Sequence, residues 1–486
     1  MNFRLLVVLF GLLALTGTKF KTFAQSRIKS VPFVYVPEAS EDRYNQRLKH
    51  KTLAINETDF VILSKKADSE YAIERYDANI NKVWTSAILL NPGEEIEAFS
   101  KTADVVYVLS HRSDKNVGSQ ILTAQLVDLK TGRKLEQKKI FEAPSKSRRI
   151  GVSVSEDGSK IVAFQYLMQE DRIKAISASV YDARLQKLKD RTYNLRDIST
   201  NFSAGLKLDN QGNQFLTILS DDNTKLSVRR YINNSEEAKA MSVQLGGMFG
   251  GRKVYVFELQ YFLTQEGLLY AAATCLDQGT AEYHSLKVVK FDFTAGEMAF
   301  APEFKFTPEY LASLNKFYPD GKPVTRLEDI ALSQLILTPE KDLIIIAEKK
   351  YMEGGENSNY VARELHLFTY DEYLNLAWRS VIMKNQVAPS DEGFSGISYL
   401  ASYHDGALNI LTLETLKGKT DLYSRTINPK NGAGEVIVPL GLNVANDKAV
   451  AYIKDFTAWL GPKTLITVSR PTKKSATLQL NKISLK

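Results

Sequence analysis

The sequence predicts an all-β fold in which eight four-stranded units form a closed ring, a β-propeller. Three observations predict it: a hairpin motif that recurs along the chain, a polar turn and buried strand that recur in step with it, and unpaired strands at both chain ends. Repeats of roughly 40–50 residues with four strands each are typical of propeller blades. A single blade cannot bury both of its faces, so it must stack on neighbours.

The hairpin motif has three copies that align without gaps: residues 76–84 (YDANINKVW), 370–378 (YDEYLNLAW) and 181–189 (YDARLQKLK). In each copy the Asp is expected to accept hydrogen bonds from free backbone N–H groups of a turn. The apolar residue three places later is expected to tuck under that turn. Looser copies lie at 127–132, 291–296, 426–432 and, most weakly, 230–234.

A polar turn followed by an apolar strand precedes each hairpin at a consistent distance. These turns lie at residues 57–59, 101–104, 156–158, 210–212, 265–267, 340–342 and 404–406. Each unit therefore contains a strand, a turn, a buried strand, a loop, a strand, an Asp turn and a fourth strand.

The two ends of the chain complete one further unit. The C-terminal segment from residue 457 supplies three strands, and residues 31–36 (VPFVYV) can supply the fourth. This pairing would close a ring of eight blades; seven blades is the alternative if these segments pair otherwise. One insertion, residues 308–317, has apolar residues at helical spacing after a Pro and predicts a short helix.

The first 24 residues predict a signal peptide that precedes a single propeller domain, residues 25–486. Arg4 comes before an apolar run at residues 5–15, which is shorter than a membrane span of roughly 20 residues. Thr22 and Ala24 fit the small-x-small pattern of signal peptidase, so cleavage is expected after Ala24, with Gln25 as the alternative site. An uncleaved anchor is the competing interpretation. The expected location is periplasmic or secreted.

The net charge limits the expected classes of partner, and the cysteine content limits the expected chemistry. Removal of Arg4, Lys19 and Lys21 with the leader lowers the formal charge from +7 to +4, and the remaining basic residues are interleaved with acids. Nucleic acid is therefore not an expected partner, and the mature chain is expected to be a monomer without a transmembrane segment. Cys275, the single cysteine, lies in an apolar strand-like run and is expected to be an inert core residue.

The sequence offers no constellation that predicts catalysis or a metal site. The five histidines lack metal-ligand spacing, no nucleophile elbow is present, and the recurring turn Asp residues explain the carboxylates near strand ends. No cofactor or metal is expected. His366 lies inside a strand, and Trp84, Trp378 and Trp459 occupy strand positions that predict packing between blades.

Two irregular loops are the candidate contact surfaces. Residues 246–253 (GGMFGGRK) are the most glycine-dense stretch, and residues 352–360 form a Gly-containing loop between two strands of one unit. Because function tends to lie in loops held by a rigid frame, the candidate binding residues are Phe249, Arg252, Lys253, Glu353, Asn357 and Tyr360.

The hairpins and the Asp-Gly turns resemble the blades of the broad β-propeller superfamily, over residues 31–486. Together with the leader ending TFAQS, they resemble an exported propeller family of Bacteroidota-type bacteria. The chain lacks the paired motifs of WD40 repeats and the sialidase Asp box, so the resemblance implies an architecture and no catalytic residue.

Two functions are compatible with these features. The first is a non-enzymatic exported binding or scaffold protein that uses one propeller face and its irregular loops to bind a protein or glycan partner of the cell envelope. The alternative is a carbohydrate- or peptide-processing hydrolase with its site at the mouth of the central channel, which would need two converging carboxylates.

Overall fold

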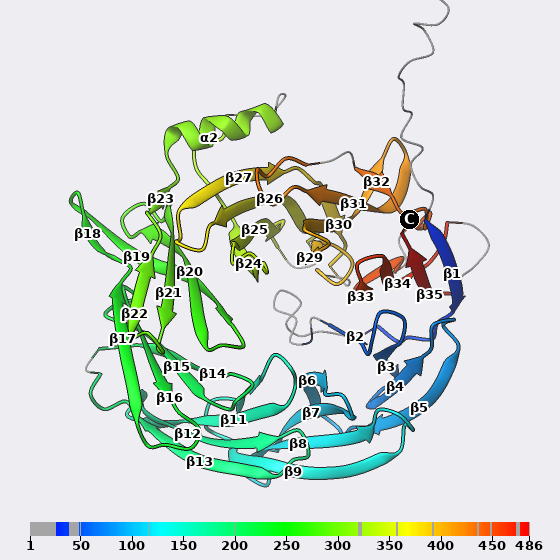
Figure 1. Ribbon diagram of the computed structural model, residues 1–486, viewed down its shortest axis with the longest axis horizontal. Helices are drawn as coiled ribbons and strands as arrows, with labels where there is room; N and C mark the ends of the chain where they lie inside the picture. The colour runs from blue at the N-terminus through cyan, green and yellow to red at the C-terminus, as the bar shows by residue number, and fades with distance from the viewer. Residues whose placement is uncertain are drawn as a thin grey trace, which may run out of the picture.

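The structure is a computed structural model, and it describes residues 26–37, 48, 50–114, 116–198, 200–318, 323–355, 358–390, 393–434, 437–447, 450–472 and 477–485. Eight antiparallel sheets follow one another around a ring (Figure 1). The eight-bladed propeller predicted from the sequence is therefore confirmed. The predicted signal peptide, residues 1–24, lies outside the described residues.

Blades 1 to 7 run from an inner strand to an outer strand in chain order. Blade 1 contains β2 (Thr52–Ala54), β3 (Phe60–Ala67), β4 (Glu70–Tyr76) and β5 (Lys82–Leu89). Blade 2 contains β6 (Glu95–Lys101), β7 (Val105–Asp114), β8 (Ser119–Asp128) and β9 (Lys134–Pro144). Blade 3 contains β10 (Gly151–Val154), β11 (Lys160–Gln169), β12 (Arg172–Asp182) and β13 (Lys187–Asn194). Blade 4 contains β14 (Ser203–Leu208), β15 (Gln214–Ser220), β16 (Lys225–Tyr231) and β17 (Ala238–Gln244).

Blades 5 and 6 carry extra short strands. Blade 5 contains β18 (Gly247–Phe249), β19 (Arg252–Leu263), β20 (Leu268–Asp277), β21 (Tyr283–Asp292), β22 (Glu297–Phe300) and β23 (Phe304–Lys305). Blade 6 contains β24 (Ile330–Leu337), β25 (Leu343–Met352), β26 (Tyr360–Tyr370), β27 (Leu376–Ile382) and β28 (Gln386–Ala388). Blade 7 contains β29 (Tyr399–His404), β30 (Ala407–Leu416), β31 (Lys419–Ile427) and β32 (Val438–Pro439).

Blade 8 joins the two ends of the chain. It contains β33 (Tyr452–Gly461), β34 (Thr464–Ser469), β35 (Gln479–Ser484) and, as its outer strand, β1 (Arg27–Pro32) from the N-terminal side. The predicted closure by both ends is confirmed, but the strand lies at Arg27–Pro32 and not at residues 31–36. β1 pairs with β35 from Arg27↔Ser484 to Pro32↔Gln479. Phe33 follows the strand and enters the core between blades 8 and 1.

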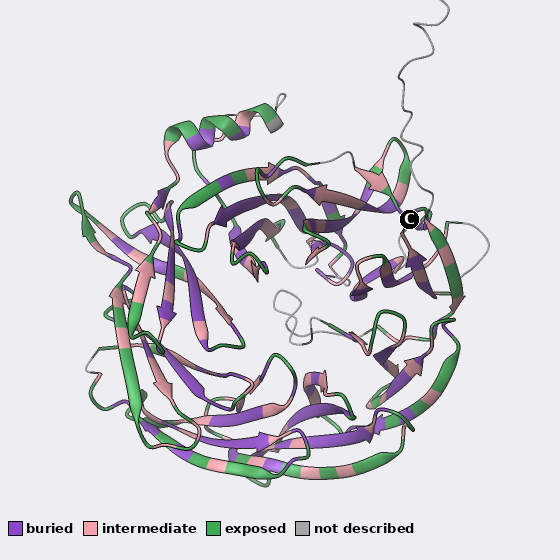
Figure 2. Cartoon of the chain, viewed as in Figure 1, coloured by how far each residue is buried: buried purple, intermediate pink, exposed green. Residues whose placement is uncertain are grey.

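The hydrophobic core is divided among the spaces between blades. Eight clusters of buried residues each draw on two neighbouring blades, and a ninth, smaller one lies beneath the connection from blade 6 to blade 7. Figure 2 shows buried residues concentrated in the inner and middle strands, with exposed residues along the outer strands. Alternating side chains of each blade thus face the blades on its two sides, which is why no blade can fold as an isolated sheet.

The predicted Asp turns are present with the expected hydrogen bonds. Asp77 Oδ1 accepts from the backbone N–H groups of Asn79 and Asn81, at 2.8 Å each. Ile80, three residues after the Asp, is fully buried beneath the turn with a φ of +53°. The same left-handed conformation and full burial occur at the equivalent positions of the other two gapless copies, Leu185 and Leu374.

Two of the tryptophans pack against the glycine turn of the next blade. The ring of Trp84 in blade 1 covers Gly132 of blade 2, where an added Cβ would lie 2.6 Å from the ring atom Cδ2. The Trp84 indole N–H donates to the carbonyl of Leu129 at 3.3 Å. Trp378 of blade 6 covers Gly432 of blade 7 in the same way, so that an added Cβ would overlap its ring. The predicted packing between blades is confirmed at both positions.

The remaining residues of note also serve packing. Trp459 of blade 8 lies against His404 of blade 7, with ring centroids 4.4 Å apart. Cys275 is fully buried in the core between blades 4 and 5, and burial raises the pKa of its thiol to about 11. The thiol is therefore neutral at physiological pH, as expected of an inert core residue.

The helical insertion lies between blades 5 and 6. It consists of α2 (Pro308–Leu314) and the 3₁₀ turn η1 (Asn315–Phe317). The hydroxyl of Tyr310 on α2 lies 2.6 Å from Nδ1 of His366 on β26. On the same strand, a carboxylate oxygen of Glu364 lies 3.9 Å from Nε2 of His366, and Glu364 also accepts a hydrogen bond from the hydroxyl of Tyr318. This buried polar cluster fastens the insertion to blade 6.

Closure of the ring by β1 is open to a direct test. A chain that begins at Phe33 should unfold with a free energy lower by on the order of 3–6 kcal/mol than one that begins at Ser26, because it loses the six residue pairs of β1 with β35. Urea denaturation of the two truncated chains measures the difference. Equal stabilities would mean that β1 is not the strand that holds the ring closed.

The cluster around Glu364 predicts a pH dependence. Burial alone would raise the pKa of the Glu364 carboxyl, but the nearby His366 ring and hydrogen bonds from Tyr318 and the backbone outweigh it and lower the pKa to about 2. An unfolded glutamate titrates near a pKa of about 4.3, so the ionised carboxylate stabilises the folded chain above about pH 5. That stability is lost as the pH falls toward the folded pKa.

Glu364→Gln should therefore lower the free energy of unfolding by about 3 kcal/mol at pH 6, and the difference from the parent chain should shrink toward pH 2. Urea denaturation of both chains at intervals from pH 2 to 6 gives this difference directly. A difference that stays constant across this range would contradict the assignment of the pH dependence to Glu364.

Candidate functional site

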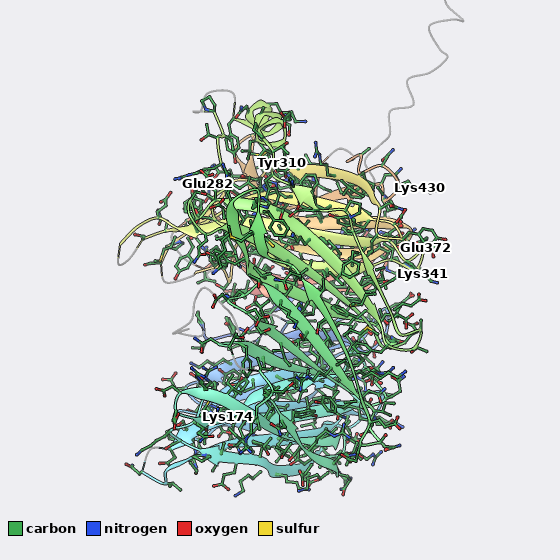
Figure 3. All side chains as sticks on the ribbon, turned by 90° about the vertical axis from the view of Figure 1, so that its left-hand side faces the viewer. Lys174, Glu282, Tyr310, Lys341, Glu372 and Lys430 are labelled. Atoms are coloured by element: carbon green, nitrogen blue, oxygen red, sulfur yellow. The ribbon has the colours of Figure 1, made fainter. Side chains whose placement is uncertain are left out.

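The two faces of the ring are built from different kinds of connection. On one face, here called the turn face, lie the turns between the first and second strands and between the third and fourth strands of the blades. On the other, the loop face, lie the loops between second and third strands and the connections from blade to blade. In side view, Lys174 and Glu282 lie toward the loop face, opposite Lys341, Glu372 and Lys430 on the turn face (Figure 3).

Several exposed apolar side chains lie on the loop face. Val117 and Met248 are 68% and 67% exposed, and each stands at the tip of a hairpin. Further exposed apolar residues on the same face are Val34, Phe249, Met352 and Val387. They belong to blades 2, 5, 6 and 8, so they offer several separate apolar contacts on one face of the ring.

The glycine-rich stretch forms one of these tips. Gly250 and Gly251 have φ values of +59° and +80° and make the two-residue turn between β18 and β19, a turn that needs positive φ at both positions. Phe249 is partly exposed, and the Lys287 ammonium nitrogen lies 4.5 Å from the centroid of its ring.

The two predicted cations of this tip are paired with acids of neighbouring loops. Arg252 Nε lies 3.7 Å from Asp277 Oδ2, and Lys253 Nζ lies 3.3 Å from Asp222 Oδ2. Of the described residues of this stretch, Met248 and Phe249 offer apolar surface, whereas the two cations are held by loops on either side.

The second predicted loop lies on the same face, in neighbouring blade 6. The backbone N–H of Glu353 donates to the carbonyl of Asn359 at 3.0 Å, which closes the loop. Tyr360 is buried, and its ring packs edge-on against Phe394 with centroids 5.0 Å apart. It therefore supports the loop from below. Asn357 lies outside the described residues.

A pocket of about 390 Å³ opens on the loop face where blades 6, 7 and 8 meet. We call it the loop-face pocket. Three segments surround it: the connection that follows blade 6, the loop of blade 7 and the connection that follows blade 7. Its lining includes amide, hydroxyl and carboxylate groups of Gln386, Glu414, Thr420, Asn446 and Tyr452. β28, which forms one wall, pairs with β26 from Tyr360↔Ala388.

Buried ion pairs hold the floor of the loop-face pocket. Lys384 Nζ lies 2.7 Å from Glu348 Oε1, with both side chains buried, and it donates to Gln386 Oε1 at 2.8 Å. Arg425 Nη1 lies 2.7 Å from Glu414 Oε1. Burial is the largest influence on Lys384 and lowers the pKa of its ammonium group, against the opposing effect of Glu348. These pairs fix Gln386 and Glu414, two of the polar groups that line the pocket.

The sequence did not point to this pocket, although two signals were present. Glu348 ends an otherwise apolar run in β25, and Glu414 lies in a mostly apolar stretch of β30. A charged residue in a buried strand requires a partner. The partners Lys384 and Arg425 could not be assigned without the register of the strands.

Neither a metal site nor a membrane helix is evident in the part of the chain that the structure describes. Within those residues, no group of three or more His, Cys, Asp or Glu side chains is placed to hold a metal ion. The helix α2 is far shorter than a membrane span, and none among the described residues is long and apolar enough to cross a bilayer.

Comparison with known proteins shows similarity in fold. No family model and no curated protein matches the sequence. Among solved structures, the β-propeller domain of the Trilobed protease from Pyrococcus furiosus has 10% identity and a TM-score of 0.37, over 82% of this chain and 97% of that one. Prolyl oligopeptidase B from Galerina marginata has 9% identity and a TM-score of 0.42, over 88% of this chain and 56% of that one.

A third example is oligopeptidase B from Trypanosoma brucei, with 9% identity and a TM-score of 0.40, over 90% of this chain and 56% of that one. This chain thus spans just over half the length of the two oligopeptidases. Similarities this weak are in keeping with the propeller fold and assign no function to the chain.

The buried pair beneath the pocket has a measurable consequence for stability. Lys384→Met leaves the Glu348 carboxylate buried without a cation, and we expect the free energy of unfolding to fall by about 3–5 kcal/mol. The double variant Glu348→Gln, Lys384→Met removes both charges and should cost less. As a control, Lys139→Met removes one partner of an exposed pair with Glu142 and should change the free energy of unfolding far less. In urea denaturation, a double variant as unstable as Lys384→Met would show that the unpaired charge is not the cause.

Proposed function

We propose that this chain is a non-enzymatic binding or scaffold protein, located in the periplasm or secreted, that binds a protein or glycan partner of the cell envelope through its loop face. The observation that carries the proposal is the composition of the loop face. This face carries a polar pocket, lined in part by Val387, and it exposes Val117, Met248, Phe249 and Met352 at other points of the ring. An apolar surface beside convergent polar groups is suited to a partner that docks and also inserts a polar group.

The state of the carboxylates supports binding over hydrolysis. A glycosidase would need two carboxylates free to act on one substrate. In the loop-face pocket, Glu414 is held by Arg425 and by the hydroxyl of Thr412, which donates at 2.6 Å. The second pocket carboxylate, Asp447, accepts a hydrogen bond from Arg470. Both acids are thus engaged in holding the structure, so no observation favours the hydrolase alternative.

Site-specific photocrosslinking tests the proposal. A benzophenone side chain placed at Met248 on the loop face should give discrete crosslinked products when the protein is mixed with cell-envelope extract or with a panel of purified glycans. The same side chain placed at Tyr373, which is exposed on the turn face, is the matched control and should give none. Both positions are exposed tips, so neither substitution should disturb the core.

A second measurement distinguishes specific binding of a partner from non-specific adhesion to exposed apolar side chains. Met248→Asp and Phe249→Asp together should lower the yield of the crosslink formed from a probe at Met352, exposed in neighbouring blade 6, by roughly tenfold, since they place charge in a contact surface. Equal labelling from the two faces, or a yield that does not respond to the charges, would overturn the proposal.

A further inference from the structure

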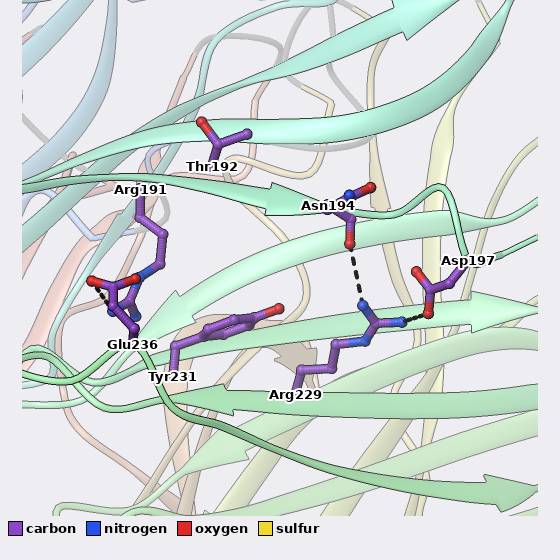
Figure 4. Close-up of a pocket in the computed structure, with 7 residues that line it drawn as sticks. All are labelled: Arg191, Thr192, Asn194, Asp197, Arg229, Tyr231 and Glu236. Carbon is purple, nitrogen blue, oxygen red and sulfur yellow. Dashed lines mark hydrogen bonds and ion pairs between the residues drawn. The ribbon is translucent and has the colours of Figure 1, made fainter.

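A second cavity lies on the outer circumference of the ring, between blades 3 and 4. We call it the rim groove. It has a volume of about 460 Å³ and lies between β13 and β16 (Figure 4). Its lining residues are Arg191, Thr192, Asn194, Asp197, Arg229, Tyr231 and Glu236. Volumes of 300–1,000 Å³ are typical of small-ligand sites.

Arg191 is a buried cation at one end of the groove. Its side chain is 5% exposed, and its guanidinium donates to Gln214 Oε1 at 2.8 Å and to the carbonyls of Ile232 and Ser235. The guanidinium carbon lies 5.3 Å from the centroid of the Tyr231 ring. Its Nε atom is buried and has no hydrogen-bond partner among the described residues. The groups that hold Arg191 are therefore mostly neutral, which leaves its charge incompletely compensated.

Arg229 occupies the other end of the groove, and the Tyr231 ring lies between the two arginines (Figure 4). Arg229 donates to the carbonyl of Asn194 at 3.2 Å and to Asp197 Oδ2 at 2.5 Å. Its side chain is 19% exposed, whereas that of Asp197 is 61% exposed. As at Arg191, the cation is largely buried and the acid that faces it lies in solvent.

The acids of the groove do not balance its cations. Lys189 Nζ lies 2.7 Å from Glu236 Oε1, and Arg191 Nη2 lies 3.8 Å from the same oxygen, so one carboxylate serves two cations. With Arg229 and Asp197, three cations face two acids, an excess of one positive charge. The Glu236 side chain is 85% exposed, and exposed ion pairs contribute little to stability because water screens them. Glu236 can therefore leave Arg191 at little cost.

We propose that the rim groove binds a small organic anion, whose carboxylate or phosphate takes the place of Glu236 beside Arg191 and whose body lies against the Tyr231 ring. Planar guanidinium groups bind both kinds of anion through paired hydrogen bonds. The exposed acids Glu236 and Asp197 occupy the groove as internal competitors for the same cations. The inference is independent of the loop face, because the groove lies on a different surface of the ring.

Isothermal titration calorimetry with the full chain tests this inference. The probes are benzoate and inorganic phosphate, with benzamide as the neutral counterpart of benzoate. At least one of the two anions should bind with a dissociation constant in the millimolar range or below, and benzamide should not bind. Stronger binding of benzoate identifies carboxylates as the ligand class, and stronger binding of phosphate identifies phosphate-bearing ligands.

The variants distinguish a ligand site from a structural ion cluster. Glu236→Gln removes an exposed competitor and should tighten anion binding by roughly threefold to tenfold, while Arg229→Gln should weaken it by at least as much. Glu142→Gln, which breaks an exposed Lys139 pair on β9, is the matched control and should change nothing. The inference would be overturned if neither benzoate nor phosphate showed saturable binding up to 20 mM. It would also be overturned if Glu236→Gln left the affinity for the bound anion unchanged.

Discussion

The sharing of each hydrophobic core between two blades is the constraint on which the whole structure depends. Each of the eight inter-blade clusters requires strands from both of its neighbours, so the ring is stable only when it is closed. Closure brings Phe33, which follows β1, against Phe456 in β33, with the two ring centroids 5.2 Å apart. The rigidity of both surface sites follows, because each is framed by strands that cannot move without opening a shared core.

The same constraint explains why the two faces differ. On the turn face, the buried left-handed residues Ile80, Leu185 and Leu374 fix the hairpins from within. The Trp84 ring covers Gly132 of the next blade so closely that no side chain fits there. The turns are thus part of the packing. The loop-face connections also send apolar residues such as Phe33 and Leu314 into the cores, but they differ in length and content from blade to blade.

Periodic features could be predicted from the sequence, and pairings between distant residues could not. The blade number and the ring closure follow from repeated turns and strands. We expected the closing strand at residues 31–36 because this run is apolar, but the strand lies earlier in the chain, at Arg27–Pro32. Phe33 fills a core, and the more polar β1 forms the outer edge of the blade. Glycine density indicated the tip at Phe249, but the Lys384–Glu348 pair and the rim groove depend on strand register.

The two charged regions differ in a way that bears on function. Beneath the loop-face pocket, Lys384 and Glu348 are both buried, so each charge has lost its water and is compensated by the other. Such a pair holds structure and offers little to a ligand. In the rim groove, Arg191 is buried while Glu236 lies in solvent, so the cation has lost its water without gaining a fixed counter-ion. An anion that enters the groove can supply that counter-ion, whereas one that enters the loop-face pocket would meet charges already paired.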